Sequence, residues 1–228
     1  MARLTWHGHS CFTLVTDDDT RIMFDPFLEE NPKADIGLKD VEDLDFILAS
    51  HGHFDHFTDA IPLAKRTGAT IVGAFELATF AQNQGVENVH PMNIGGGHAF
   101  PFGYAKMTPA LHTATVAGDD EGAFTTQPAG WWLDMNGKRL YHAGDTALLT
   151  DMQLLKGKVD VALLPIGDNF TMGPDDAAIA VEFIEPRVVI PMHYGTWELI
   201  DQDPNAFKEK VAEWAEVVIL DAGDSYNF

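Results

Sequence analysis

Cysteine is almost absent from the chain: Cys11 is the only one, so no disulfide can form within the molecule. With one thiol and no charged leader followed by an apolar stretch, we expect a cytoplasmic protein. No apolar run approaches the length that crosses a bilayer, so we do not expect a membrane partner. Cys11 itself is expected to be a small buried residue and not a nucleophile.

Basic residues are scarce as well, with 14 Lys plus Arg against 35 Asp plus Glu and a formal net charge of -21. Such a surface repels a phosphate backbone, so we do not expect nucleic acid as a partner. Divalent ions bound to the protein would make the local charge positive, so an anionic substrate is not excluded. A small-molecule substrate is therefore expected, and assembly into a homo-oligomer is left open.

Repeats and low-complexity tracts are also missing, and 228 residues with 46% hydrophobic content can build a sizeable core. We predict a single domain over 1–228, made of two packed halves at roughly 1–110 and 111–228. Strands are predicted at 4–16, 21–24, 46–50, 70–73, 104–111, 130–135, 139–141, 159–164, 188–192 and 217–220. Helices are predicted at 58–65, 76–84, 174–184 and 204–214.

What the chain does have is a dense run of metal-ligating side chains, His51-Gly52-His53-Phe54-Asp55-His56. Imidazole with carboxylate is a donor set for a transition metal and not for calcium. His51 and His53 are two residues apart after an apolar strand, so they can share one ion. A helix start near Thr58 turns the chain, which directs Asp55 and His56 toward a second ion. Unrelated polar residues in a loop, with Asp55 as a helix cap, are the alternative.

Gly52 lies inside this run, where the missing side chain would let backbone and metal approach closely. Four ligands cannot complete two catalytic sites, because each ion needs about three protein ligands and an exchangeable water. His112, Asp145 and His193 each follow a short apolar segment, as site residues on loops of a rigid scaffold usually do. They are the candidates to complete both sites.

Five motifs, beginning with Phe24-Asp25-Pro26, resemble in the same order those of the metallo-β-lactamase-fold hydrolases across nearly the whole chain. Segments 6–12 and 169–178 resemble a small UPF0173-like branch of metal-dependent hydrolases that is related to the ascorbate-6-phosphate lactonases. The resemblance implies an α/β (α+β) fold, a four-layer αββα sandwich of two β-sheets with outer helices. The ligands would lie along one edge, between the halves.

The resemblance also implies the role of each candidate ligand. The first ion would be held by His51, His53 and His112, the second by Asp55, His56 and His193, and Asp145 would bridge the two. Asp25 would stand outside the ligands and orient one of them; a turn-forming Asp before Pro26 is the alternative. The cofactors would be two divalent ions, with zinc expected first and manganese or iron as the alternatives.

Contacts to the substrate are less defined by the sequence. His7 and His9 are predicted to face one side of strand 4–16, and the resemblance makes His9 a candidate substrate contact or proton donor, with a structural histidine as the alternative. Asn169 and Thr171 precede the predicted helix 174–184, whose free amides could bind an anionic group. Tyr194, just after His193, would line the pocket or merely pack.

The leading hypothesis is hydrolysis of a small ester, lactone or phosphodiester by a hydroxide that bridges two metal ions, with a lactone favoured slightly. Asp55, Asp145 and His9 are the catalytic candidates. Two alternatives stay open: an iron-dependent dioxygenase similar to the persulfide dioxygenases, and a metal-binding protein without turnover. Metal analysis with oxygen uptake would separate the first alternative from the hydrolase, and a substrate panel would separate the second.

Overall fold

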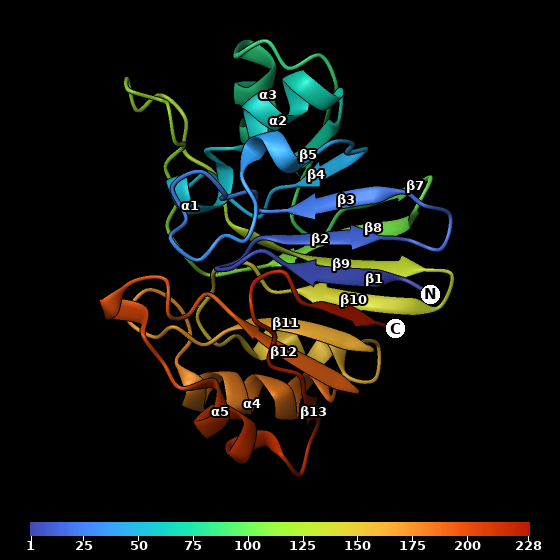
Figure 1. The fold of residues 1–228 in the computed structure, drawn as a ribbon, viewed down its shortest axis with the longest axis vertical. Helices are drawn as coiled ribbons and strands as arrows, with labels where there is room; N and C mark the ends of the chain where they lie inside the picture. The colour runs from blue at the N-terminus through green and yellow to red at the C-terminus, as the bar shows by residue number, and fades with distance from the viewer.

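The strands form two seven-stranded mixed sheets, seen in Figure 1 in a computed structural model that describes residues 1–228. In spatial order the first sheet contains β14 (Ser225–Asn227), β1 (Arg3–Trp6), β2 (Phe12–Val15), β3 (Arg21–Phe24), β4 (Phe46–Leu48), β5 (Thr70–Ala74) and β6 (Val89–Met92). The second contains β13 (Glu216–Val217), β12 (Val188–Met192), β11 (Val161–Pro165), β10 (Lys138–His142), β9 (Ala129–Met135), β8 (Gly103–Pro109) and β7 (Gly97–Phe100).

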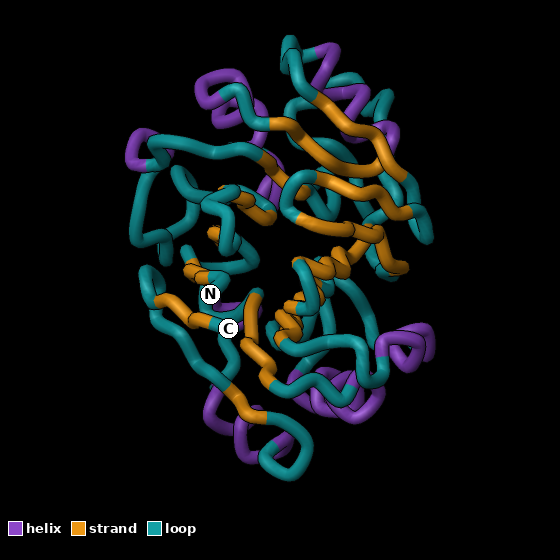
Figure 2. Tube along the Cα trace, turned by 90° about the vertical axis from the view of Figure 1, so that its right-hand side faces the viewer, coloured by secondary structure: helices purple, strands orange, loops and turns teal.

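The helices lie outside the two sheets. They are α1 (Phe54–Phe57), α2 (Ala60–Thr67), α3 (Phe75–Asn83), α4 (Pro174–Ile184) and α5 (Pro204–Val211), with short 3-10 helices η1 (Leu38–Asp40), η2 (Thr150–Leu155) and η3 (Glu198–Ile200). Helices α2 and α3 stand at one end of the molecule and α4 and α5 at the other, with the strands between them (Figures 1 and 2). This confirms the predicted sandwich of two sheets with outer helices. The longest helix, α4, has 11 residues, and none could cross a membrane.

A continuous apolar core joins the sheets and contains 59 buried residues drawn from both. Strands β11 and β12 are buried along their whole length, as expected of parallel strands that are covered on both faces. His142 at the end of β10 is a polar residue that packs against this core: it is fully buried, its ring stacks on Phe24 with centroids 5.1 Å apart, and its Nε2 lies 3.1 Å from the carbonyl oxygen of Ser10.

Both sheets follow the same plan, which sets the position of the loops. In the first sheet β1, β2 and β3 pair antiparallel and β3 to β6 pair parallel, while in the second β7 to β10 are antiparallel and β10 to β13 are parallel. Parallel strands bring their carboxyl ends to one edge of a sheet. Loops that follow β3, β4, β10 and β12 therefore open at shared edges, and these loops carry Asp25, His51, Asp145 and His193.

The predicted strand 4–16 is wrong, because the chain forms β1 and β2 with a tight loop between them. Gly8 and His9 have φ of +87° and +55°, and the backbone N–H of His7 donates to the carbonyl of Cys11 at 2.8 Å. Positive φ breaks the alternation of an extended strand. The predicted shared face of His7 and His9 is therefore also wrong: the His7 ring contacts Asp35, while the His9 ring enters the site described below.

Other boundaries differ from the prediction for local reasons. The helix predicted at 58–65 is α2, which begins two residues later, and the short helix α1 before it was not expected. Strands β6, β7 and β14 were not expected, since β6 contains Pro91 and the pattern of β7 has no buried face to read. The predictions for 174–184 and 188–192 are confirmed. Cys11 is fully buried, and burial raises the pKa of its thiol.

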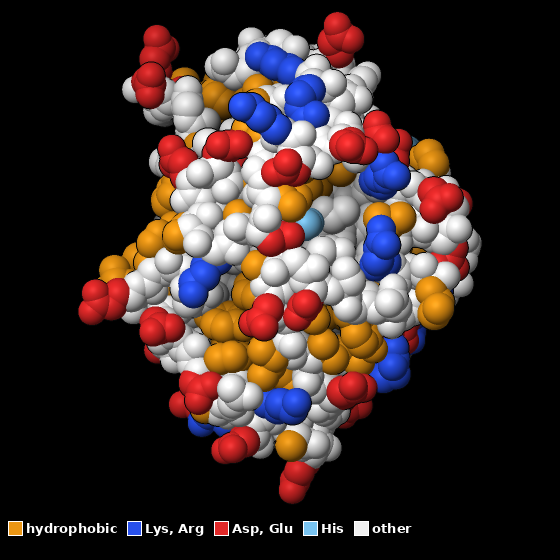
Figure 3. All heavy atoms as spheres, viewed as in Figure 1, with side chains coloured by type: hydrophobic (Ala, Val, Ile, Leu, Met, Phe, Trp, Pro, Cys, Tyr) orange, Lys and Arg blue, Asp and Glu red, His pale blue; other side chains and the backbone are white.

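Acidic side chains are scattered over the face that Figure 3 shows, whereas the basic ones gather in a few places. Several of the ion pairs between Lys or Arg and acidic residues are solvent-exposed; Lys156 with Glu185 is one, at 2.7 Å. Exposed pairs contribute at most about 1 kcal/mol each. The apolar core, and not the surface charge, therefore carries the stability of the fold.

Acid should weaken the fold through His142. Burial lowers the pKa of His142, so below its ordinary value of 6.5 the unfolded chain takes up a proton that the folded chain excludes. The free energy of unfolding should fall between pH 7.5 and 5.5, by up to about 1.4 kcal/mol from this residue. Urea unfolding of the metal-free protein at both pH values, for the wild type and for His142→Gln, measures the difference.

Over the same pH step, the free energy of unfolding of His142→Gln should fall by up to about 1.4 kcal/mol less than that of the wild type. The variant should have a lower free energy of unfolding than the wild type at pH 7.5. His98→Gln, at an exposed position on β7, is the matched control and should follow the wild type. Equal pH dependence in the wild type and in His142→Gln would contradict the assignment.

Candidate metal centre

Three histidine rings form the first group of candidate ligands. Nε2 of His51 lies 3.0 Å from Nδ1 of His53, and Nε2 of His112 lies 3.3 Å from that same atom. The three nitrogens are mutually within 4.8 Å, although His112 is more than fifty residues away in sequence, on the loop after β8. These are the residues that the sequence predicted for the first ion, and the fold brings all three together.

Asp55, His56 and His193 form the second group, again with ligand atoms within 4.8 Å of one another. Oδ2 of Asp55 lies 3.8 Å from Nε2 of His56 and 3.9 Å from Nε2 of His193. The side chains of His56 and His193 are almost completely buried, and that of Asp55 is 12% exposed. They too are the residues predicted for one ion, and they come from α1 and from the loop after β12.

One carboxylate oxygen lies between the two groups. Oδ2 of Asp145 is 3.9 Å from Nε2 of His51 and 3.7 Å from Nε2 of His112 in the first group. The same oxygen is 3.3 Å from Nε2 of His56 and 3.0 Å from Nε2 of His193 in the second. Asp145 is therefore the side chain best placed to bridge ions held by the two groups.

Asp25 fixes the orientation of two candidate ligands from behind. Its Oδ1 accepts the backbone N–H of Ser50 at 2.7 Å, and its Oδ2 accepts the Ser50 hydroxyl at 2.6 Å. The Ser50 oxygen, at 2.9 Å, is thereby left to accept from Nδ1 of His51, and Nδ1 of His56 donates to Asp25 Oδ2 at 2.8 Å. With both Nδ1 atoms protonated, the Nε2 lone pairs of these rings face the centre of the site.

The local fold explains how one short motif serves both groups. His53 is extended, with φ of -61° and ψ of 156°, and occupies the N-cap of α1, so His51 and His53 approach from the incoming strand. Asp55 and His56 lie in the helical turn and point toward the second group. Gly52 was expected to admit a metal; instead a Cβ at Gly52 would lie 2.7 Å from the carbonyl oxygen of Thr115, so Gly52 admits the loop that follows His112.

The first group has the protonation state that metal binding requires. Burial lowers the pKa of His51 well below its ordinary value, and burial likewise lowers the pKa of His53 and of His112. All three rings are therefore neutral at pH 7, and a neutral imidazole is the form that binds a metal.

The second group carries the charge of the site. Burial would raise the pKa of Asp55 and of Asp145, but neighbouring histidines outweigh burial and hold both pKa values below the ordinary range. Burial would lower the pKa of His56, but Asp145 and Asp55 outweigh it and raise that pKa well above normal. The buried carboxylates therefore require positive charge close by, which a proton on His56 or a divalent ion can provide.

His9 holds the second group together and shows no exposed surface. Its Nε2 lies 3.1 Å from Oδ2 of Asp55, and its Nδ1 lies 2.8 Å from Oγ1 of Thr196. Its backbone carbonyl accepts the N–H of His193 at 3.0 Å, and the two rings have centroids 4.1 Å apart. Burial, with the nearby His193, lowers the pKa of His9 to about 3, so the ring is neutral.

The donor set fits metal ions on an observation independent of any motif. Nε2 of His56 and Oδ1 of Asp145 are buried without a hydrogen-bond partner. A buried polar atom left unpaired costs about 1 to 3 kcal/mol, so such atoms need an explanation. Nitrogen and carboxylate donors in two groups of three suit zinc, iron or manganese.

An aromatic wall lies beside the second group. Its residue Trp197 was a candidate from the sequence, as a residue that lines the pocket or merely packs, whereas Phe27 and Phe54 were missed. The Trp197 ring lies 5.0 Å from His9, 6.1 Å from Phe27 and 5.9 Å from Phe54 between centroids. Phe54 is 51% exposed, which is unusual for a large apolar residue between two candidate ligands. Its place inside the six-residue motif was the available signal. Ser50 and Thr196 were missed as well, because single hydroxyl residues next to histidines form no recognisable pattern.

The predicted substrate contacts are less closely tied to the centre. Tyr194 stacks on Trp6 with centroids 5.7 Å apart, and burial raises the pKa of Tyr194 to about 12. Asn169 is exposed on the loop before α4, and the hydroxyl of Thr171 donates to the carbonyl of Met172 at 3.3 Å. None of them contacts a candidate ligand through a hydrogen bond. Their role in substrate binding stays a prediction.

The chain matches known proteins over its whole length. Residues 3–193 match the family model described as a beta-lactamase superfamily domain. A UPF0173 metal-dependent hydrolase of Bacillus mycoides is 48% identical over 229 residues, which cover 99% of each chain. The structure of Igni18, a metallo hydrolase of the archaeon Ignicoccus hospitalis, is 34% identical with a TM-score of 0.90 and covers 100% of this chain and 99% of its own.

A more distant structure, the diiron beta-hydroxylase CmlA of Streptomyces venezuelae, shares the fold at 14% identity with a TM-score of 0.74; the match covers 100% of this chain and 54% of CmlA. At this identity the likeness concerns the fold alone. The match of the family model, together with the near-complete coverage of the Bacillus relative, decides the membership. The chain belongs to the metallo-β-lactamase superfamily and, within it, to the UPF0173 family of metal-dependent hydrolases.

Proposed function

We propose that this metal-dependent hydrolase cleaves a small ester, lactone or phosphodiester at a centre that holds two divalent ions, with zinc expected first. The observation that carries the proposal is the position of Asp145, whose Oδ2 lies within 3.9 Å of a ring nitrogen in each group of ligands. Bound there, the ions would polarise the scissile carbonyl or phosphoryl group and lower the pKa of a water molecule to about 7.

The chain's own residues prepare this chemistry. His51, His53 and His112 offer neutral nitrogens on one side, and Asp55, His56 and His193 offer a charged set on the other. Asp145 fixes the separation of the two sets, and Asp25 holds the rings of His51 and His56 in one tautomer through Ser50 and by direct contact. Ligands held in this way need little rearrangement when substrate arrives.

For His9 we propose a positioning role in place of proton donation. A fully buried ring with a pKa of about 3 holds no spare proton at neutral pH, and both of its nitrogens are engaged. Its Nε2–H donates to Asp55 while its Nδ1 accepts the Thr196 hydroxyl proton. Thr196 therefore selects the tautomer that holds Asp55 in place.

The aromatic wall favours a substrate with an apolar part. Phe54 and Trp197 lie beside the second group, and Phe54 is half exposed. Together with the chain's net charge of -21, this wall favours a small ester or lactone over a phosphodiester of a nucleic acid. The name of the Bacillus relative, a metal-dependent hydrolase, favours hydrolysis over iron-dependent oxidation.

Elemental analysis of the protein purified without chelator is the first test. We expect two divalent ions per chain, and hydrolysis from an ester, lactone and phosphodiester panel that chelation abolishes and the same metal restores. Oxygen uptake without hydrolysis would overturn the proposal in favour of iron-dependent oxidation. Bound metal without turnover on the whole panel would favour a binding protein.

Asp145→Asn and His193→Ala should each lower kcat/KM on the best substrate by more than about 100-fold, because even partners outside the ligands are worth about 10- to 100-fold. Both variants should keep the secondary structure of the wild type by circular dichroism. The controls are Asp176→Asn and His98→Ala, exposed positions outside the centre, which should leave kcat/KM unchanged. Full activity of either ligand variant, after adventitious metal is removed, would disprove the assigned site.

Thr196→Val should weaken one of two metal-binding steps by about tenfold and leave the other unchanged, because it releases His9 and hence Asp55. Calorimetric titration of the metal-free protein with zinc measures both steps without any substrate. Thr196→Ser keeps the hydroxyl and should restore the wild-type affinity. If both variants bind like the wild type, or if serine is as weak as valine, Thr196 does not act through its hydroxyl.

A further inference from the structure

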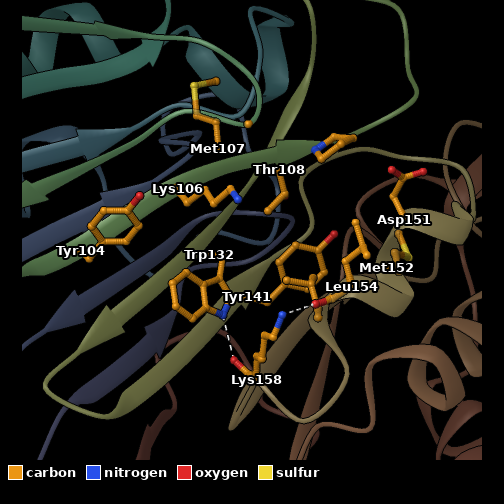
Figure 4. Close-up of a pocket in the computed structure, with 13 residues that line it drawn as sticks. Tyr104, Lys106, Met107, Thr108, Trp132, Tyr141, Asp151, Met152, Leu154 and Lys158 are labelled. Atoms are coloured by element: carbon orange, nitrogen blue, oxygen red, sulfur yellow. Dashed lines mark hydrogen bonds between the residues drawn. The ribbon is translucent and has the colours of Figure 1, made fainter.

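A hollow of about 580 Å³ lies on the outer face of the second sheet, away from the candidate ligands. Lys106, Trp132 and Tyr141 are paired across β8, β9 and β10, and η2 forms another wall (Figure 4). The alternate residues Ala105 and Trp131 are fully buried in the core and do not line the hollow, so the hollow is on the opposite face. None of the candidate ligands lines it.

The walls of this hollow are aromatic, and one of the rings is held by a hydrogen bond. Tyr104 and Trp132 have ring centroids 6.4 Å apart at an angle of 66°, and Tyr141 is 1% exposed at the base. Nε1 of Trp132 donates to the carbonyl of Lys158 at 2.8 Å, which fixes the indole. Aromatic rings at an open surface favour a flat ligand, because aromatic groups gain from stacked or edge contacts.

The polar groups that line the hollow favour an anionic ligand. Lys106 forms no ion pair, and Figure 4 shows it between Tyr104 and Thr108. Lys158, which donates to the carbonyl of Leu154 at 2.9 Å, is a second ammonium group, whereas Asp151 is the only carboxylate of the lining. This local excess of positive charge stands in a chain of net charge -21. Thr108 is 7% exposed, and its buried hydroxyl oxygen lacks a hydrogen-bond partner.

We propose that the hollow binds a planar aromatic anion of the aryl carboxylate class, at a site separate from the metal centre. The rings of Tyr104 and Trp132 contact the flat apolar part, and the ammonium group of Lys106 pairs with the carboxylate. A volume of about 580 Å³ lies within the range of small-molecule sites, about 300 to 1,000 Å³. The proposal does not rest on the proposed function, since it needs neither metal nor turnover.

The test is calorimetric titration of the whole chain with 2-naphthoate, as purified and again after metal removal. We expect one molecule bound per chain in both forms, with a Kd of about 1 mM or tighter. Lys106→Met and Tyr104→Ser should each weaken binding at least about threefold. Lys65→Met, an exposed lysine on α2, is the matched control and should bind like the wild type. The neutral 2-naphthamide should bind as weakly to the wild type as 2-naphthoate binds to Lys106→Met.

Three results would overturn the proposal. The first is no saturable binding, or binding that Lys106→Met and Tyr104→Ser leave unchanged. The second is binding that disappears with the metal, which would assign the naphthoate to the metal centre. The third is a dimer in light scattering that Leu154→Ser converts to a monomer, since a second copy would then cover this face; Leu154 is 70% exposed at its rim.

Discussion

The carboxylate of Asp25 is the contact on which the centre depends. It is fully buried, and it joins the end of β3 to the loop after β4 through Ser50 and to α1 through His56. The contact through Ser50 fixes the ring of His51, and the direct contact fixes the ring of His56. Both rings present their Nε2 atoms to the site. Without Asp25, the rings of His51 and His56 could rotate and change tautomer. The spacing of the first and second groups would then no longer be set by the sheet.

Strain and charge concentrate at the same place. Asp25, His9 and His193 all have positive φ, of 42°, 55° and 55°, which ordinary residues avoid. The surrounding hydrogen bonds impose these conformations: the N–H of His193 donates to the carbonyl of His9, which also accepts from Nε1 of Trp6. Such strain persists only where packing over-determines it, and it is found mostly at functional sites. The rigid sandwich therefore supports a centre whose buried carboxylates need a cation.

The sequence predicted much of the fold and the candidate site for identifiable reasons. A buried parallel strand such as β12 reads as an apolar run, and α4 starts at Pro174 with acidic residues behind it. The candidate ligands could be recognised in the sequence because four of them lie within six residues and the others follow apolar segments. The loop at His9 was read as strand because Gly8 alone does not reveal a positive φ. The partners Ser50 and Thr196 had no pattern at all.

The sequence by itself determined which residue types could bind metal and that they follow strands, because ligand chemistry and apolar runs are local properties. Only the tertiary structure decided how they combine. His112 meets His53, and Asp145 comes between the groups, because two sheets pack with the carboxyl ends of their strands at one edge. The tertiary structure also decided the role of His9 and the hollow over β8 and β9, since each depends on segments that meet only when the sheets are formed.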